Sequence, residues 1–234
     1  MLFGCLVQDL DKMKSKFDEA LVLYKNGQIN RAEEICLEIL KIEPNNFNVL
    51  HLLGIIAYQN KNYKSSDELI AKAIKIKPDY GEAYCNRGIV LSKLNKFDEA
   101  IESFDQAIKF NPRHIKAYNN RGSILFKLRK LDEALKNYEK AIEIKFDEVD
   151  LHINLGNILI DLKKFDAALE SFDQAIKINP NNPHSHYNRG IALFKLNKLE
   201  EAIKSYQKSI TIEPNHADAY RNIAVVLKKN NQLY

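Results

Sequence analysis

The chain has 234 residues, with 35 Lys and Arg against 31 Asp and Glu, so its formal net charge is +4. The 45% hydrophobic content excludes a disordered chain and is sufficient for a packed core. Eight Gly and six Pro are few for this length, which argues against an all-β protein and favours helices. Charges of both signs are interspersed without a basic block, and this argues against nucleic acid as a partner.

The cysteines and the N-terminus indicate a cytoplasmic protein. Cys5, Cys36 and Cys85 lack metal-ligand spacing, so we expect reduced thiols and no bound metal or other cofactor. No apolar run reaches the ~18 residues that a membrane-spanning helix needs. The first seven residues lack the basic region of a secretory signal. Residues 1–12 are expected to form an extension, either a short helix or a frayed end.

Three series of residues recur with a period of 34. The prolines are Pro44, Pro78, Pro112, Pro180 and Pro214, with Phe146 in the remaining place. The glycines are Gly54, Gly88, Gly122, Gly156 and Gly190, with Ala20 and Ala224 at the outer ends. A third series of small residues is Ala32, Ser66, Ala100, Ala134, Ala168 and Ala202. Three series with one period indicate an internal repeat.

The repeat divides the chain into helical hairpins. The predicted units are 13–46, 47–80, 81–114, 115–148, 149–182 and 183–216, followed by a half repeat at 217–234. Within the third unit, apolar and small residues follow the i, i+3, i+4 spacing of two amphipathic helices. Asn95 is expected to end the first helix in the left-handed conformation, as Gly27 does in the first unit. The second helix is expected to end before Pro112.

The pattern within each unit resembles the tetratricopeptide repeat family. The matching positions of the third unit are Tyr84, Gly88, Ala100, Phe104, Ala107 and Pro112. The resemblance covers residues 13–234 as one domain. It implies an all-α fold, a right-handed α-solenoid (superhelix) of six helix-turn-helix repeats of 34 residues plus one additional C-terminal helix. Because Phe146 replaces the usual proline, we expect a slightly longer helix or an altered turn between the fourth and fifth repeats.

A single hairpin cannot cover its apolar face, so neighbouring hairpins are expected to stack. The recurring small residues are predicted to mark close helix approaches, and Gly122→Leu is expected to overpack the stack. Two positions of the first helix, which lines the concave groove in the family, vary among the repeats. One is held by Phe17, His51, Cys85, Asn119, Ile153, Tyr187 and Arg221, and the other by Leu21, Ile55, Ile89, Ser123, Asn157, Ile191 and Val225. Such variation is typical of a surface that reads a non-repetitive partner, and equally of an unconstrained surface.

A row of asparagines is the sharpest candidate for ligand binding. Its members are Asn86, Asn120, Asn154, Asn188 and Asn222. An amide both donates and accepts hydrogen bonds, so it can hold a peptide backbone. The repeats are similar to those of O-linked N-acetylglucosamine transferases and related bacterial transferases, which implies that these asparagines grip an acceptor peptide. The alternative is a structural role, since asparagine is common at this place in the family. Asn119, Asn157 and Arg221 complete the polar candidates.

Large side chains and lysines follow the same side of the repeats. Tyr24, Tyr58, Phe126, Ile160 and Phe194 are expected either to accept apolar anchors of a partner or to be partly buried under the next repeat. Lys25, Lys93, Lys127, Lys195 and Lys229 favour an acidic ligand, unless they are ordinary solvated lysines. A carboxylate clamp of the chaperone-binding kind is not expected, because Ile153 stands where the lysine partner of Asn157 would be required.

The sequence offers no catalytic motif, and His152 and His186 are expected to be packing residues. The first functional hypothesis is a non-catalytic module that binds an extended protein or peptide segment in its concave groove. The second is the acceptor-recognition arm of a glycosyltransferase-like or other group-transferase enzyme. The second is motivated by the stretch 50–57 and by the end of the sequence within a repeat. A third possibility is self-association through the C-terminal helix, where Tyr220 and Leu227 are expected to be partly uncovered.

Overall fold

The computed structural model describes the backbone of residues 2–231 and the side chains of residues 14–230. Within this range all regular structure is α-helical. The helices are α1 (Leu2–Lys25), α2 (Ile29–Ile42), α3 (Phe47–Gln59), α4 (Tyr63–Ile76), α5 (Gly81–Lys93), α6 (Phe97–Phe110), α7 (Ile115–Lys127), α8 (Leu131–Ile144), α9 (Val149–Asp161), α10 (Phe165–Ile178), α11 (Pro183–Lys195), α12 (Leu199–Ile212) and α13 (Ala217–Asn231). Because α1 begins at Leu2, the predicted N-terminal extension is helical, whereas the side chain of Cys5 lies outside the described residues.

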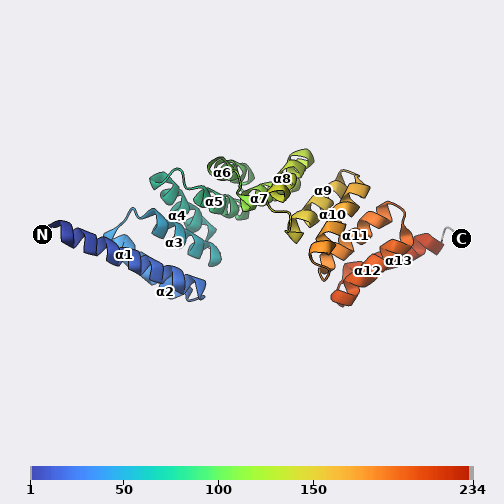
Figure 1. Ribbon diagram of the computed structural model, residues 1–234, viewed down its shortest axis with the longest axis horizontal. Coiled ribbons are helices and arrows are strands. Elements are labelled where there is room, and N and C mark those ends of the chain that lie inside the picture. Colours follow the sequence, from blue (N-terminus) through green and yellow to red (C-terminus); the bar gives the residue numbers. More distant parts are fainter. Residues whose placement is uncertain (1, 232–234) are drawn as a thin grey trace. The chain divides into compact units, whose positions relative to one another are not determined.

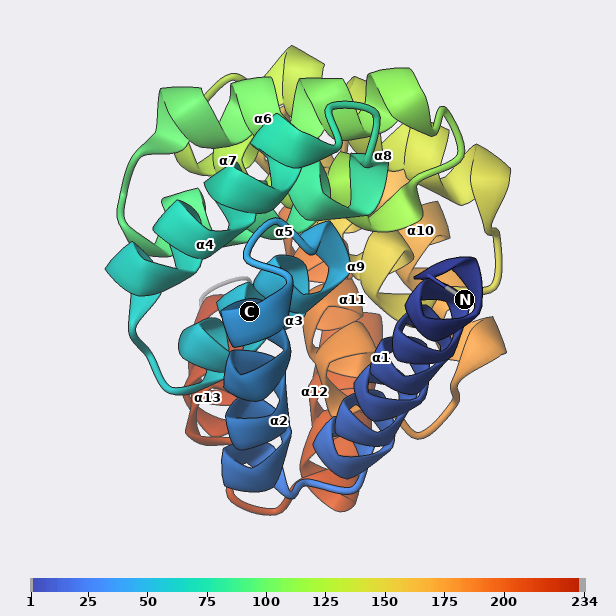
Figure 2. The same ribbon diagram turned by 90° about the vertical axis from the view of Figure 1, so that its left-hand side faces the viewer.

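The helices pair into hairpins and group into two units. The first unit is Met1–Pro112 and holds α1 to α6, and the second is Arg113–Tyr234 and holds α7 to α13. Figure 1 shows the helices following one another as antiparallel pairs, and Figure 2 shows the turn that joins α1 to α2. Each predicted full repeat contains one such pair. Within each unit every helix packs on the next one in sequence, so the hairpins stack as predicted. That residues 13–234 form a single domain stays a prediction.

The turn inside each hairpin is closed by a residue in the left-handed region. Asn95 has φ 59° and Gly27 has φ 76°, which confirms both predicted helix ends. Lys61, Arg129 and Lys163 adopt the same conformation at the equivalent place in their own hairpins. Because left-handed backbone favours Gly or Asn, these three residues add local strain that the rest of the hairpin must offset.

The recurring glycines allow the two helices of a hairpin to approach closely. A Cβ atom built on Gly88 would lie 2.7 Å from the Phe104 ring, and one built on Gly156 would lie 2.4 Å from the Phe172 ring. At Gly122 the nearest atom would be Cε2 of Tyr138, at 2.9 Å. These distances confirm the predicted close approach, since any side chain larger than hydrogen would collide with a buried ring.

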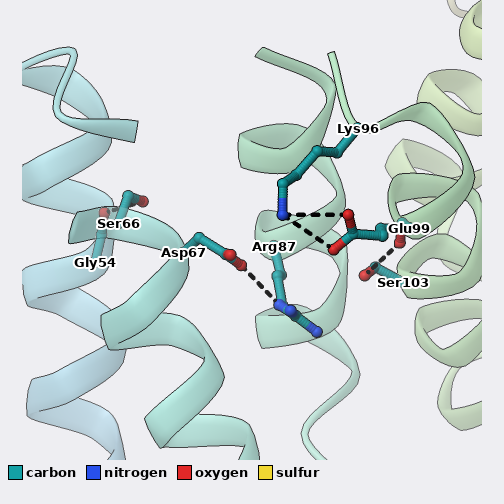
Figure 3. A network of polar contacts seen from close by, with 7 residues as sticks. All are labelled: Gly54, Ser66, Asp67, Arg87, Lys96, Glu99 and Ser103. Atoms are coloured by element: carbon teal, nitrogen blue, oxygen red, sulfur yellow. Dashed lines mark hydrogen bonds and ion pairs between the residues drawn. The ribbon is translucent and has the colours of Figure 1, made fainter. Parts of the chain in front are cut away.

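Polar contacts also connect the helices of the first unit, as Figure 3 shows. The Ser66 hydroxyl on α4 donates to the Gly54 carbonyl on α3, with an O–O distance of 2.6 Å. Arg87 on α5 donates through Nε to Asp67 on α4 at 2.8 Å, and so joins successive hairpins. The α3–α4 hairpin is therefore fixed to α5 by a partly buried ion pair as well as by apolar packing.

The joint at Phe146 has the same form as the other joints of its unit. Helix α8 ends at Ile144 and α9 begins at Val149, and the turn between α10 and α11 has the same length. The Phe146 carbonyl accepts a hydrogen bond from His152 Nε2 at 2.7 Å, as the Pro180 carbonyl does from His186 at 2.9 Å. The predicted longer helix or altered turn is therefore wrong, because the turn keeps its length with Phe in place of Pro and the Phe146 carbonyl makes the same contact as the Pro180 carbonyl. Both histidines are buried, which confirms their packing role.

Candidate functional site

The first helices of the first unit line a pocket, which we call the first inner pocket. Its residues are Tyr24, Ile55, Tyr58, Gln59, Ile70, Asn86, Ile89 and Val90, which enclose about 220 Å³. They come from α1, α3 and α5, except for Ile70, which is a buried residue of α4. No ionisable carboxylate or amine is among the lining residues, and Gln59 Nε2 donates to the Tyr24 hydroxyl at 2.7 Å. The pocket thus combines apolar walls with a few amide and phenol groups.

The second unit carries an equivalent hollow, which we call the second inner pocket. Its residues are Phe126, Asn157, Ile160, Asp161, Phe172, Asn188 and Ile191, which enclose about 230 Å³. Each of the seven stands 102 residues, or three repeats of 34, after a residue that lines the first inner pocket. Helices α7, α9 and α11 supply its walls, and the buried ring of Phe172 on α10 takes the place of Ile70. The same repeat positions therefore build a hollow in both units.

The two inner pockets differ in polarity. Asn157 replaces Ile55, and Asp161 replaces Gln59. Asp161 forms an ion pair with Arg129, which lies in the turn that follows α7. The rim of the second inner pocket is consequently charged and polar, whereas that of the first is neutral.

Three of the five asparagines in the predicted row bond to the preceding first helix. Asn86 Nδ2 lies 2.9 Å from His51 Nε2, Asn154 Nδ2 lies 3.3 Å from Asn119 Oδ1, and Asn222 Nδ2 lies 3.2 Å from the Tyr187 hydroxyl. The remaining two differ. Asn120 donates to the Lys116 carbonyl of its own helix at 2.8 Å, and Asn188 lines the second inner pocket. The row therefore takes part in packing as well as facing the pockets.

His51 is a buried polar residue of α3. Its Nδ1 atom lies 3.2 Å from the Tyr80 hydroxyl, and its Nε2 atom faces Asn86. Only 6% of the residue is exposed. Burial lowers the pKa of His51, although the nearby Glu82 carboxylate opposes the shift. The neutral ring can donate to Tyr80 and accept from Asn86 at the same time.

The structure corrects one prediction about the variable positions. His51, Cys85 and Ile153 hold the first of these positions and are buried, so the expectation that this position faces an open groove is wrong for them. They are buried because the first helices of adjacent hairpins contact each other directly, as α3 contacts α5 and α9 contacts α11. Arg221, at the same position of α13, is exposed and pairs with Asp218 of its own helix.

The second variable position lies at the pockets. Ile55 and Ile89 line the first inner pocket, and Asn157 and Ile191 line the second. Tyr58 and Phe126, predicted to receive apolar anchors, are lining residues as well. Phe194 is partly buried, and the Lys229 ammonium lies 5.0 Å from the centre of its ring.

The predicted row of lysines lies apart from the pocket linings. Lys93, Lys127 and Lys195 are exposed and belong to the last turns of α5, α7 and α11. At this place a cation complements the partial negative charge of the helix C-terminus. Their recurrence thus has a structural explanation that needs no ligand.

Sequence reasoning missed two pairs of pocket residues. Gln59 and Asp161 directly follow the large residues that were singled out, and their recurrence at one repeat position was the available signal. Ile70 and Phe172 were missed because they lie on second helices, which the groove hypothesis did not consider. Their burial shows that the second helix closes the bottom of each pocket.

Two general searches bear on other kinds of site. In the described residues, no cluster of three or more His, Cys, Asp or Glu side chains has the geometry to hold a metal ion. None of the helices described combines the length and the hydropathy that are needed to cross a membrane.

Family models match most of the repeats. Models described as tetratricopeptide repeat match residues 47–80, 81–114, 115–147, 183–216 and 205–234, and one described as TPR repeat matches residues 156–197. Comparison with curated protein sequences gives no match. The resemblance to the repeats of O-linked N-acetylglucosamine transferases therefore stays a prediction.

Solved structures share the fold at low sequence identity. PilF of Pseudomonas aeruginosa is 15% identical with a TM-score of 0.80, and the match covers 92% of this chain and 97% of that one. YrrB, described as a TPR protein with an unusual peptide-binding site, is 19% identical with a TM-score of 0.69, covering 80% and 96%. The C-terminal part of a TPR repeat-containing protein from Cytophaga hutchinsonii is 19% identical with a TM-score of 0.77, covering 92% and 88%. With its stacked helical hairpins and its matches to repeat models along most of its length, the chain belongs to the tetratricopeptide repeat family.

Proposed function

We propose that the chain is a non-catalytic protein-interaction module that binds an extended peptide segment along its first helices. The observation that carries the proposal is the recurrence of one pocket in both units, at seven equivalent positions. A hollow that occurs in only one repeat is readily explained as a packing defect. A hollow rebuilt three repeats later, with different side chains on the same framework, fits a surface that reads successive residues of a partner.

The size and lining of the inner pockets suit side chains of a peptide. Each encloses little more than 200 Å³, which is below the range typical of drug-sized ligands and cofactors. Apolar walls beside a few amide groups are typical of sites where a buried anchor supplies most of the binding energy. The comparison with solved structures also supports peptide binding, since YrrB, which shares the fold, is described as having a peptide-binding site.

Filling the pockets tests the proposal. The probe is a peptide recovered from a random dodecapeptide display library with the full chain as bait, and its binding is followed by fluorescence anisotropy. Ile89→Trp fills the first inner pocket, and Ile191→Trp fills the second at the equivalent position. We expect at least one of them to weaken binding by about tenfold or more, the scale of one anchor residue.

Leu37→Trp is the matched control, because Leu37 is an exposed residue of α2 that lines neither pocket. It should leave the affinity unchanged. If the library yields no peptide, or if both filled variants fold and bind the peptide as the unmodified chain does, the proposed function is wrong.

A further inference from the structure

The asparagines of the predicted row share one feature of their hydrogen bonding. In all four whose side chain makes a hydrogen bond, the atom engaged is Nδ2, the donor end of the amide. In Asn120 the partner is a backbone carbonyl, so only the amide nitrogen can face it. The donor end of the row is thus largely used within the chain.

The partners across helices recur every second repeat. His51, Asn119 and Tyr187 each stand 35 residues before the asparagine that they hold, and they are 68 residues apart. Each of them can accept a hydrogen bond through a ring nitrogen, an amide oxygen or a hydroxyl. Ile153, which stands 35 residues before Asn188, cannot accept one, and Asn188 has no such contact among the described side chains.

The acceptor end of these amides remains available to solvent. Among residues 14–230 every buried side-chain nitrogen or oxygen has a hydrogen-bond partner. The Oδ1 atoms of Asn86 and Asn154 receive no hydrogen bond from the described residues, so they are not buried. An incoming group therefore meets carbonyl oxygens held in fixed positions rather than freely rotating amides.

We propose that His51, Asn119 and Tyr187 are positioning residues, which hold Asn86, Asn154 and Asn222 so that these side chains act as hydrogen-bond acceptors for a ligand. The inference rests on the proposed function and adds the chemistry of the bound segment. The ligand is an extended backbone that presents N–H groups to the first helices, and proline is disfavoured at the residues that meet these asparagines. Fixing the amides beforehand spares the ligand the entropy of ordering them.

The spacing of first helices is compatible with such a ligand. Packed helix axes lie ~8–10 Å apart. An extended chain advances ~3.3–3.6 Å per residue. Roughly one residue in three would then meet an asparagine, and the residues between them are free to place side chains in the inner pockets.

An ester scan of the peptide from the display library tests the inference. Replacing one backbone amide by an ester removes its N–H donor and keeps the chain length. The scan is run against the full chain and against Asn154→Ala, and the position whose ester effect disappears in Asn154→Ala is the residue that meets Asn154. We expect the ester at this position to weaken binding to the unmodified chain by about three- to tenfold, as one hydrogen bond does.

Two reciprocal variants then test the positioning role. Asn119→Ile removes the partner of Asn154 and gives it an isoleucine 35 residues earlier, as Asn188 has in Ile153. Ile153→Asn makes the reverse change and offers Asn188 a hydrogen-bond partner. In Asn119→Ile the ester effect should shrink to less than about twofold, because a freely rotating amide gains little from the N–H group. In Ile153→Asn an ester effect that depends on Asn188 should appear or grow. Asn48→Ile, at an exposed position of α3, is the matched control and should change nothing.

The results separate the two proposals. If Asn154→Ala weakens binding but no ester position is coupled to it, the asparagine acts as a donor and the inference is overturned while the proposed function stands. An undiminished ester effect in folded Asn119→Ile also overturns it. If the filled-pocket variants bind normally, the proposed function fails first. Thermal unfolding and side-chain amide NMR signals of Asn154 show whether each variant is folded and whether the amide has changed its environment.

Discussion

At the scale of single residues, the fold depends on the contact of a glycine with one bulky side chain in every hairpin from α3–α4 to α11–α12. Gly54, Gly88, Gly122, Gly156 and Gly190 lie against Ile70, Phe104, Tyr138, Phe172 and Tyr206. The first hairpin solves the same problem differently, with Ala20 and Cys36 at these two positions, both fully buried. A larger residue on the first helix is thus matched by a smaller one on the second.

This pairing predicts a coupling between Gly156 and Phe172. Gly156→Ala places a methyl group 2.4 Å from the Phe172 ring and is expected to lower the free energy of unfolding by ~1–3 kcal/mol. In the Phe172→Cys background, which has the cysteine of the first hairpin at this position, Gly156→Ala should lower the free energy of unfolding by less than half as much. Urea unfolding of the four proteins measures both values. Equal costs in the two backgrounds would show that the ring does not restrict this position.

His51 predicts a dependence of stability on pH. Because burial lowers the pKa of His51 in the folded chain, the unfolded chain binds the proton more readily, and stability decreases as the pH falls below the ordinary value of about 6.5. The slope contributed by one residue is at most ~1.4 kcal/mol per pH unit. Urea unfolding between pH 7.5 and 5.5 should show a steeper decline for the unmodified chain than for His51→Gln. Parallel declines would mean that His51 titrates normally in the folded chain.

At the scale of helices and turns, the 34-residue period was sufficient to place every hairpin. It located the turns through Gly27 and Asn95, because these residue types tolerate positive φ. The residue type gives no such indication at Lys163, since lysine has no preference for the left-handed region. The equivalence with Gly27 through the repeat was the only sign of its conformation. The wrong expectation at Phe146 has the opposite origin, since it gave weight to the missing proline although the turn has the same length with either residue.

The conformation of Lys163 predicts a stabilising substitution. Lys163 has φ 60°, and the turn that it closes is bonded by its own N–H and that of Lys164 to carbonyls of α9. Lys163→Gly relieves the left-handed strain and is expected to raise the free energy of unfolding by ~0.5–1 kcal/mol, after the entropy lost by glycine is deducted. Lys204→Gly, at an exposed position within α12, should lower it by a similar amount. If both changes lower the melting temperature equally, the turn carries no such strain.

At the scale of the whole molecule, the sequence predicted the family, and it placed the candidate ligand-binding residues on the first helix of each hairpin. It identified Tyr58, Phe126 and Asn157 as candidates, and the structure places them in the two inner pockets. It did not predict that these positions converge with second-helix residues on one hollow, because that depends on how the two helices of a hairpin pack. Nor did it predict which asparagines are held by the preceding helix, because the partner is supplied by the variable position of another repeat.

The two inner pockets show that one repeat framework can carry linings of different polarity. The first inner pocket has a neutral rim, whereas Asp161 and its partner Arg129 give the second a charged one. The change from Ile55 to Asn157 falls at a variable position, and in both pockets the second-helix residue, Ile70 or Phe172, also packs against the glycine of its hairpin. The repeat can therefore change the lining of a pocket while it keeps the helical hairpin.

Photo-crosslinking from defined positions tests most directly whether the first helices bind the ligand. A benzophenone amino acid is placed at Gln59 or Asp161, at the rims of the two inner pockets, and at Lys72 or Gln207, which are exposed on the second helices α4 and α12. With the peptide recovered from the display library, crosslinks should form from Gln59 and Asp161 and be absent from Lys72 and Gln207. Crosslinking from the second helices, with none from the pocket rims, would contradict the account.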